Sequence, residues 1–491
     1  MKYLFLPMQP TPNGRMHIGH GGGTYLRADV IARALRRDGH EVLIASGTDA
    51  FENWILAAAV QDGLTPEGTC RQYHQGITGD FEALDIHFDA WIDPLSAEHR
   101  EPYVALHNEF FDLIRSSPTV TREREMVPYG ADSGDPMMGT FIAGNCPNCG
   151  ASCGGSSCTA CSEHFQPEQL LDAHSRISDE AIEWRQEENW FIRPRDPAGI
   201  VGHLRKTGLA EPHVAVVERY LDRSKGRIRL SGPGKWGVPG SRLVAGHVLA
   251  NSYFLYALYA ARVVTGQDGF GAFAADSKIV TVGIFGTDIS SPGLVVPSLY
   301  SQALSGQLKP FDFTMVNGML DLAGRKVSTS QRYGIWLEDI LTSTSVTASE
   351  LRYALSGVPL DEGRANLALE TLVSDINRLR RVVRAIIGGL GKEHGDDIEA
   401  PFLATQAQYL SPEKADLPRG RRVLDDYGDW IMDGKSASVS TWLALAEPIM
   451  PSLVESLRRG DLDVKQIGRG NLDIAEVEGV AHVGRAAEQT K

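Results

Sequence analysis

The chain has 491 residues, of which 42% are hydrophobic and 22% charged, a composition typical of a globular protein with about two to four domains. Its net charge of −14 argues against broad non-specific binding to nucleic acid, although a local basic patch stays compatible with it. No apolar run approaches the ~20 residues of a membrane span, and the N-terminus lacks a signal peptide's basic start and long apolar core. We therefore expect a cytoplasmic protein without a membrane segment.

The first predicted unit is a strand, a turn and a helix at the start of the chain. The apolar run at 3–7 is typical of a buried strand, and apolar residues recur at helical spacing over 24–37. The turn carries His17, Gly19 and His20 near the predicted helix start. Such a start offers N–H groups and partial positive charge to a polyphosphate, glycine permits close approach of a nucleotide, and imidazoles donate to phosphoryl oxygens. A plain turn with two surface histidines is the alternative.

Two aspartates each follow a predicted buried strand. Asp49 comes directly after the strand at 41–47, and Asp288 comes after the strand at 278–282. Ligands of open parallel sheets bind beyond the carboxyl ends of the strands. We therefore expect the Asp49 carboxylate to meet a substrate ammonium. Turn or helix N-cap aspartates are the alternative at both positions.

An insertion rich in Gly, Pro, Ser and Cys is predicted at 126–165. It contains two C-x-x-C pairs, formed by Cys146, Cys149, Cys158 and Cys161. Two tight turns with two thiolates each supply the four ligands of a tetrahedral Zn²⁺, and four thiolates leave no position for water. The pattern therefore predicts a structural zinc site rather than disulfides, with Cys153 as a bystander.

The chain after residue 346 is predicted to be helical, with one apolar stripe running from Leu369 to Ile386. The stretch 401–418 is polar and contains proline, which favours a linker. Four arginines lie along or beside the polar side of the first helix. They predict either a solvated, ion-paired face or an RNA-facing patch, and they are Arg378, Arg380, Arg381 and Arg384.

The segment at 17–20 (His-Ile-Gly-His) resembles the first signature of class I aminoacyl-tRNA synthetases. The segment at 324–330 stands in the place of that family's late lysine-serine loop, about 300 residues further on. The cysteine knuckle, the stretch 188–192 and the Trp-Gly-Val-Pro segment at 236–239 resemble bacterial methionyl-tRNA synthetases. The resemblance is collinear over roughly residues 3–390.

This resemblance implies an α/β fold, with a class I synthetase Rossmann-like parallel sheet, a zinc-knuckle insertion and a C-terminal helical bundle. It divides the chain into four units. These are the first half of a nucleotide-binding catalytic domain (1–115), a connective insertion with the knuckle (116–215), the second catalytic half with the late loop (216–345), and an abbreviated helical domain (346–491).

The resemblance also implies an activity, in which an amino-acid carboxylate joins the α-phosphorus of ATP and pyrophosphate leaves. Mg²⁺ would bridge the phosphates, although the sequence shows no dedicated protein site for it. The implied catalytic residues are His17, His20 and Lys326. ATP would also meet Gly19, Asp288 (beside the ribose), Ser328 and Ser330. The amino acid would meet Gln9, Thr11, Asp49 and Tyr253.

The sequence departs from the family pattern in both halves of the predicted site. Thr329 stands where the family has its second loop lysine, so one cation is missing unless Arg325 or Arg332 replaces it. Gln9 and Thr11 stand where methionyl enzymes have Leu and Tyr. A thioether pocket needs apolar and aromatic walls, so we expect a small or polar amino acid rather than methionine.

The acceptor of the activated amino acid is the third departure. Asn377 and Arg381 stand near the family's anticodon-reading pair, where they face RNA or solvent. Trp430 is too close to Pro448 for the usual two intervening helices, so the anticodon reader looks incomplete. We therefore expect transfer to a small non-tRNA hydroxyl or amine in specialised metabolism, such as a hydrazine-forming pathway with a separate cupin-type partner. The alternatives are a divergent methionyl-tRNA synthetase that charges tRNA, and a catalytically silent binding paralogue.

Overall fold

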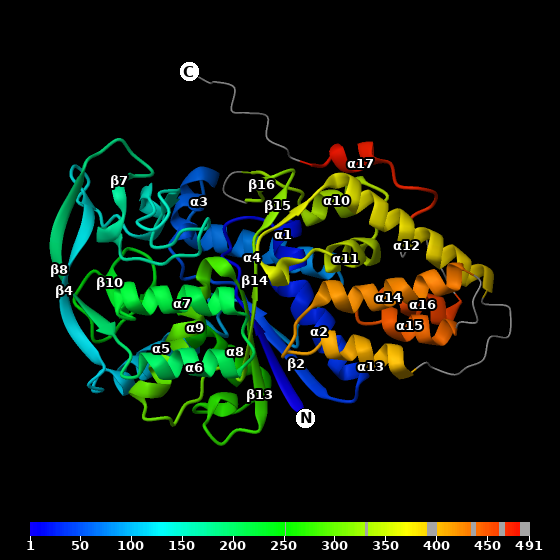
Figure 1. Cartoon of the computed structure of the whole chain (residues 1–491). Helices are drawn as coiled ribbons and strands as arrows, with labels where there is room; N and C mark the ends of the chain where they lie inside the picture. Colours follow the sequence, from blue (N-terminus) through cyan, green and yellow to red (C-terminus); the bar gives the residue numbers. More distant parts are fainter. Residues whose placement is uncertain (251, 329–331, 390–399, 434–437, 461–466, 482–491) are drawn as a thin grey trace.

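The computed structural model describes residues 1–250, 252–328, 332–389, 400–433, 438–460 and 467–481 (Figure 1). Its centre is a five-stranded sheet in the order β14-β13-β1-β2-β3, in which all neighbouring strands are parallel. The strands are β1 (Lys2–Pro7), β2 (Glu41–Gly47), β3 (Ala90–Ile92), β13 (Ile279–Gly286) and β14 (Phe313–Asn317).

Helices cover both faces of this sheet, with α2 (Leu26–Arg37) on one and α5 (Arg100–Ile114), α8 (Tyr253–Thr265) and α9 (Ser290–Ala303) on the other. Because successive side chains of a strand point to opposite faces, β1 contributes to both cores. Tyr3 and Phe5 pack with α2, whereas Leu4 and Leu6 pack with α5 and α8. A strand buried on both faces must be apolar throughout, which is what made it visible in the sequence. The predicted α/β fold is confirmed.

The insertion is built on a long antiparallel pair, β4 (Val120–Gly130) and β8 (Ile182–Ile192). Between these strands lies a three-stranded sheet that carries the cysteine turns, made of β5 (Ile142–Asn145), β6 (Ser152–Gly154) and β7 (Leu171–Ser175). The chain returns to the core through α6 (Pro197–Lys206), α7 (Glu211–Ser224), β9 (Ile228–Arg229), β10 (Ser231–Pro233), β11 (Val238–Pro239) and β12 (His247–Leu249).

Beyond β14 the chain forms a small sheet in the order β16-β15-β17, followed by helices that gather at one end of the molecule (Figure 1). The strands are β15 (Leu320–Leu322), β16 (Arg325–Lys326) and β17 (Ala365–Leu367). The helices are α10 (Leu337–Ser343), α11 (Ala348–Ser356), α12 (Leu369–Gly389), α14 (Leu417–Met432), α15 (Val439–Ala446), α16 (Pro451–Arg459) and α17 (Ile474–Glu478). None of the described helices has the length and apolar character needed to cross a membrane.

The predicted linker at 401–418 is wrong over its first half, which forms the helix α13 (Ala400–Tyr409). Gln406 is completely buried there, and its amide group donates to the carbonyls of Gly420 and Leu445 at 3.2 and 2.9 Å. A polar side chain can occupy a core position when its hydrogen bonds are satisfied inside the protein. Local composition shows no such partners, so the sequence suggested an exposed segment.

A buried guanidinium joins the helical part of the chain to the nucleotide-binding half. Arg352 of α11 is fully buried and donates to the Asp29 carboxylate of α2 at 2.5 Å. It also donates to the carbonyls of Ile449 at 2.7 Å and Asp85 at 2.9 Å. One side chain thus satisfies acceptors from three separate segments.

We expect Arg352→Ala to reduce the free energy of unfolding by about 3–5 kcal/mol, because it leaves Asp29 as a buried charge with only Arg33 beside it. Denaturant unfolding followed by circular dichroism measures this loss. The matched control is Arg458→Ala, which removes an exposed pair with Glu447 and should cost at most about 1 kcal/mol. Equal effects of the two substitutions would contradict the role given to Arg352.

Candidate active site

The turn that carries the first signature segment is hydrogen-bonded to residues 335–337, which follow the late loop. The N–H of Ile18 donates to the carbonyl of Ile335 at 2.9 Å, and the N–H of Leu337 donates to the carbonyl of Met16 at 3.0 Å. Arg15 strengthens the junction by pairing with Asp80 of α4 (Pro66–Ala83) at 2.7 Å and with Glu338 of α10 at 2.6 Å. The turn after β1 is therefore fixed against the segment that follows the late loop.

His17 and His20 hold each other's rings through the backbone of the short helix α1 (Ile18–His20). The N–H of His20 donates to Nδ1 of His17 at 3.3 Å, and the N–H of His17 donates to Nδ1 of His20 at 3.4 Å. The rings stack with centroids 3.7 Å apart and planes 13° apart. An Nδ1 that accepts a hydrogen bond carries no proton, so each neutral ring carries its proton on Nε2. Both histidines therefore present an Nε2–H donor.

Both imidazoles are neutral at physiological pH. Burial, together with the charge of nearby Lys326, lowers the pKa of His20 to about 4. Burial also lowers the pKa of His17 well below its usual range, with His20 and Lys326 adding to the effect. The pair thus offers hydrogen-bond donors without fixed charge, and a bound phosphate would raise both pKa values by favouring the protonated rings.

The three glycines after His20 allow this turn to lie against the later segments. A Cβ at Gly21 would lie 3.2 Å from Leu337, and a Cβ at Gly22 would lie 3.2 Å from Leu355 of α11. At Gly23 it would come within 2.9 Å of the Asn317 side chain, which also accepts from the Thr24 hydroxyl at 2.9 Å. The sequence motif alone did not show this requirement, because it depends on residues more than 290 positions away.

Lys326 and Asp288 belong to the same electrostatic environment as the two histidines. Burial lowers the pKa of Lys326, and Asp288 is the strongest of the charges that oppose this shift. Burial raises the pKa of Asp288, and Lys326 opposes that shift. Since Lys326 also lowers the pKa values of His17 and His20, its amine lies within electrostatic range of Asp288 and of both histidines.

The loop after Lys326 is closed at its base by the backbone of Ser328. The N–H of Ser328 donates to the carbonyl of Tyr333 at 2.8 Å, and the N–H of Tyr333 donates back at 3.1 Å. Arg325, one predicted replacement for the missing loop cation, places its guanidinium 4.4 Å above the Tyr333 ring. The predicted contact Ser330 and the substituted position Thr329 lie outside the described residues.

The predicted amino-acid contacts lie beside one another at the ends of β1 and β2. The N–H of Asp49 donates to the carbonyl of Pro10 at 2.9 Å, which places Asp49 against the turn that carries Gln9 and Thr11. Gln9 is only 5% exposed. Burial raises the pKa of Tyr103 well above its usual range, and the Asp49 carboxylate adds to this shift.

The hydroxyl of Tyr253 is hydrogen-bonded to backbone groups of the central sheet. It donates to the carbonyl of Leu6 and accepts from the N–H of Ile284 at 3.3 Å. Its ring packs against Phe285 and Phe311, with centroid distances of 5.5 and 5.8 Å. Tyr253 can therefore offer a substrate its ring but not a free hydroxyl.

A cavity of about 510 Å³ lies between the core and the insertion. None of the predicted site residues lines it, but Phe51 and Glu52 after Asp49, Ala250 before Tyr253, and Pro292 after Asp288 do. The cavity therefore adjoins the predicted site. Its volume exceeds that of a single small amino acid, and Trp236 and Met137 contribute apolar walls.

Glu52 is a lining residue that the sequence did not indicate as functional. The other acids of the cavity are satisfied, since Asp135 pairs with Lys235 at 2.7 Å and Glu180 accepts from the N–H of Ser133 at 3.0 Å. Burial raises the pKa of Glu52, and only the N–H of Asn53 opposes this shift. Ala50-Phe51-Glu52-Asn53 follows Asp49 where the family it resembles usually continues Glu/Ala-His-Gly, and this departure was the one sequence signal at the position.

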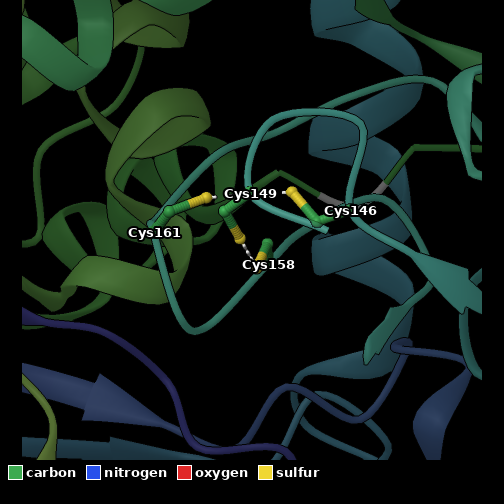
Figure 2. Close-up of side chains that lie close together, drawn as sticks. All are labelled: Cys146, Cys149, Cys158 and Cys161. Carbon is green, nitrogen blue, oxygen red and sulfur yellow. Dashed lines mark hydrogen bonds between the residues drawn. The ribbon is translucent and has the colours of Figure 1, made fainter. Parts of the chain in front are cut away.

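The four cysteines of the two C-x-x-C turns converge, as Figure 2 shows. The sulfurs of Cys146 and Cys161 are 3.8 Å apart, those of Cys149 and Cys158 are 3.7 Å apart, and all four lie within 4.8 Å of one another. A tetrahedral Zn²⁺ with bonds of ~2.3 Å needs sulfurs ~3.8 Å apart. The donor set and its spacing therefore fit a structural zinc ion.

Of the predicted RNA-facing pair on α12, Asn377 is hydrogen-bonded within the chain itself, whereas Arg381 is exposed. The amide of Asn377 donates to the carbonyl of Leu472 at 3.0 Å and accepts from its N–H at 2.7 Å. Arg380 is fully buried against Glu350, and Arg378 pairs with Asp425 at 2.6 Å. Of the two interpretations of this basic helix, ion pairing within the protein describes these two arginines, whereas Arg381 is exposed.

We expect the purified protein to contain about one zinc ion per chain, measured by elemental analysis. Cys149→Ser and Cys161→Ser should lose the metal, because three thiolates leave the tetrahedral set incomplete. Cys153→Ser is the matched control and should keep it, since Cys153 is not part of the converging group. Metal-free wild type, or equal loss in the Cys153 variant, would contradict the assignment.

Comparison with known proteins identifies relatives of this chain among methionine–tRNA ligases. Methionine–tRNA ligase of Parabacteroides distasonis is 28% identical over 359 residues, which cover 71% of this chain and 51% of the relative. The corresponding ligase of Pyrobaculum arsenaticum is 26% identical over 69% of this chain and 61% of the relative. The chain thus spans about half to two thirds of the length of these relatives.

A solved structure of Mycobacterium tuberculosis methionyl-tRNA synthetase in complex with methionyl-adenylate has the same fold, with a TM-score of 0.63 and 17% identity over 95% of both chains. The family model described as tRNA synthetases class I (M) matches residues 8–380, which is about three quarters of the chain. This chain belongs to the class I tRNA synthetase family of the methionyl type, as its two signature segments indicated.

Proposed function

We propose that this protein activates an amino acid with ATP, forming an aminoacyl adenylate and pyrophosphate. The observation that supports this proposal is the electrostatic proximity of Lys326 to His17, His20 and Asp288, together with the backbone hydrogen bonds between residues 16–18 and 335–337. Charge develops on phosphate oxygens in this reaction, and preorganised donors aimed at that charge lower the barrier. The relatives' names support the same class of chemistry.

In the proposed reaction, a carboxylate oxygen of the amino acid attacks the α-phosphorus, and the bond to the β-phosphate oxygen breaks. The Nε2–H groups of His17 and His20 donate to phosphate oxygens, and Lys326 adds a positive charge. Asp288 accepts from the ribose hydroxyls, and Gly19 lets the nucleotide lie close to the backbone. Ser328 and Ser330 add loop donors. Mg²⁺, when bound by the phosphates, supplies further positive charge.

For the amino acid, we propose that Asp49 holds the ammonium group, with Gln9, Thr11 and the Tyr253 ring close by. Gln9 and Thr11 make this pocket more polar than a thioether requires, which favours a small or polar amino acid over methionine. Glu52 adds an acid at the adjoining cavity, where it suits a substrate with a hydrogen-bond donor or an amine.

For the acceptor, we propose a small hydroxyl or amine compound in specialised metabolism, with any cupin-type partner on a separate chain. Two observations favour this over RNA: the Asn377 amide is occupied by Leu472, and a cavity of about 510 Å³ adjoins the site. The second candidate is tRNA, which is favoured by the curated names of the relatives.

Amino-acid-dependent exchange of labelled pyrophosphate into ATP, run with each common amino acid, tests the activation step. We expect signal with a small or polar amino acid, and Lys326→Ala should reduce it about 100-fold or more because it removes a cation aimed at the phosphates. Methionine as the sole substrate would contradict the pocket argument, and no signal with any amino acid would favour a silent binding protein. Robust aminoacylation of total tRNA would overturn the small-acceptor proposal.

Two substitutions of His17 separate its backbone role from its role toward phosphate. His17→Asn keeps an acceptor near the Nδ1 position and removes the Nε2 donor. It should change the unfolding free energy by less than about 0.5 kcal/mol and slow exchange about 100-fold. His17→Gln keeps a distal donor and removes the cap, so it should lose about 1 kcal/mol of stability with a smaller rate loss. The reverse ranking in exchange would contradict the Nε2–H assignment.

A further inference from the structure

The small sheet β16-β15-β17 places one carboxylate between two cations. Asp321 of β15 lies directly opposite Lys326 of β16 in an antiparallel pair, so their side chains share a face. On its other side, Asp321 is level with Asn366 of β17, and Arg364 stands two residues before that position. Asp321 is only 8% exposed. A carboxylate with so little access to water needs a positive partner.

Arg364 is the cation that forms an ion pair with the Asp321 carboxylate. Its Nε donates to Oδ2 of Asp321 at 2.6 Å. The second oxygen, Oδ1, is buried and accepts no hydrogen bond from the described residues. The amine of Lys326 forms no hydrogen bond or ion pair within the described part of the chain, although both Asp321 and Arg364 act on it electrostatically. Asp321 therefore has two cations within reach and is bonded to one of them.

We propose that Arg364 is a positioning residue that occupies Asp321 and so leaves the Lys326 amine available to the phosphates of ATP. This inference rests on the proposed activation of an amino acid with ATP. Guanidinium fits a carboxylate better than an ammonium does, and a lysine on its flexible stem readily moves to an unpaired acid. Without Arg364, Lys326 becomes the nearest cation for a buried carboxylate.

The sequence of the late loop makes the availability of the Lys326 amine important. Thr329 replaces the family's second loop lysine, so Lys326 is the single lysine between residues 310 and 391. Its capture by Asp321 would remove the whole lysine charge of the loop from the nucleotide. The position of Arg364 protects that charge without touching the substrate, which explains why a buried acid is tolerated opposite a catalytic amine.

Four variants test the proposal: Arg364→Ala, Asp321→Asn, the double variant that combines them, and Arg364→Lys. Arg364→Ala should lower kcat/KM for ATP in the exchange reaction about 10- to 100-fold, because the Lys326 amine pairs with Asp321 instead of phosphate. The double variant should recover to within about threefold of wild type, since the carboxylate of Asp321 is no longer there to capture the lysine. Asp321→Asn alone should stay near wild type, and Arg364→Lys should lie between.

Arg122→Ala is the matched control. It removes an arginine–carboxylate pair of the same 2.6 Å length, with Glu188 on the β4–β8 pair of the insertion, so it should have a much smaller effect than Arg364→Ala. A double variant as slow as Arg364→Ala would overturn the proposal and assign Arg364 either to the phosphates directly or to folding. Equal effects of the Arg122 and Arg364 variants would overturn it as well.

The reaction rate of the Lys326 amine with acetic anhydride, followed by mass spectrometry, tests the inference without ATP. Acetylation of Lys326 should slow in Arg364→Ala and recover in the double variant. Unchanged acetylation would overturn the inference even if the enzyme activates an amino acid. The expected acetylation pattern in a protein that binds no MgATP would leave the inference standing and overturn the proposed function. If Arg364→Ala does not fold, Arg364→Lys and the double variant give the same comparison.

Discussion

The structure depends on a pair of backbone hydrogen bonds between residues 16–18 and residues 335–337. They join the turn after the first strand to the segment that closes the late loop, over more than 300 positions of chain. The three glycines after His20 are needed at this junction, because side chains of α10, α11 and β14 fill the space that a Cβ would take. Neither signature segment would form a site without the other, since the donors and the lysine come from opposite sides of the junction.

The site achieves its electrostatics mainly by burial rather than by many charges. His17 and His20 are kept neutral, and the backbone N–H groups that donate to each Nδ1 leave Nε2 as the nitrogen that carries the proton. In the proposed site Lys326 supplies the lysine charge of the loop, and the charges of Lys326 and Asp288 each oppose the effect of burial on the other's pKa. Because this loop has one lysine instead of two, activity depends more strongly on whether the Lys326 amine is available to the phosphates. The ion pair between Arg364 and Asp321 bears on this availability.

The sequence predicted features that local chemistry determines. Strands buried on both faces show as apolar runs, which is why β1 and β2 were found within one residue of their observed ends. Tetrahedral thiolate ligands come from two short turns, so their spacing along the chain predicted their convergence. In both cases the interaction that stabilises the element lies within a few residues or needs only a uniform environment.

The features that the sequence did not predict depend on partners far away in the chain. The sequence suggested that Gln406 belongs to a linker, because the groups that hydrogen-bond to its side chain lie on other helices, α14, α15 and α2. Asn377 was expected to face RNA or solvent, because its partner, Leu472, is 95 residues away along the chain. The hydroxyl of Tyr253 donates to a carbonyl of β1, which its position in the sequence does not show. The role proposed for Arg364 depends on the pairing of Asp321 with Lys326 across two strands. Single positions do not reveal which polar groups the fold has already satisfied.

The most direct test of the account is a crystal structure of the protein with a non-hydrolysable ATP analogue. The account predicts that Nε2 of His17, Nε2 of His20 and Nζ of Lys326 lie within about 3 Å of oxygens of the same triphosphate. A nucleotide bound elsewhere, or imidazoles and amine directed to separate places around it, would contradict the central claim that two distant segments form one phosphate site.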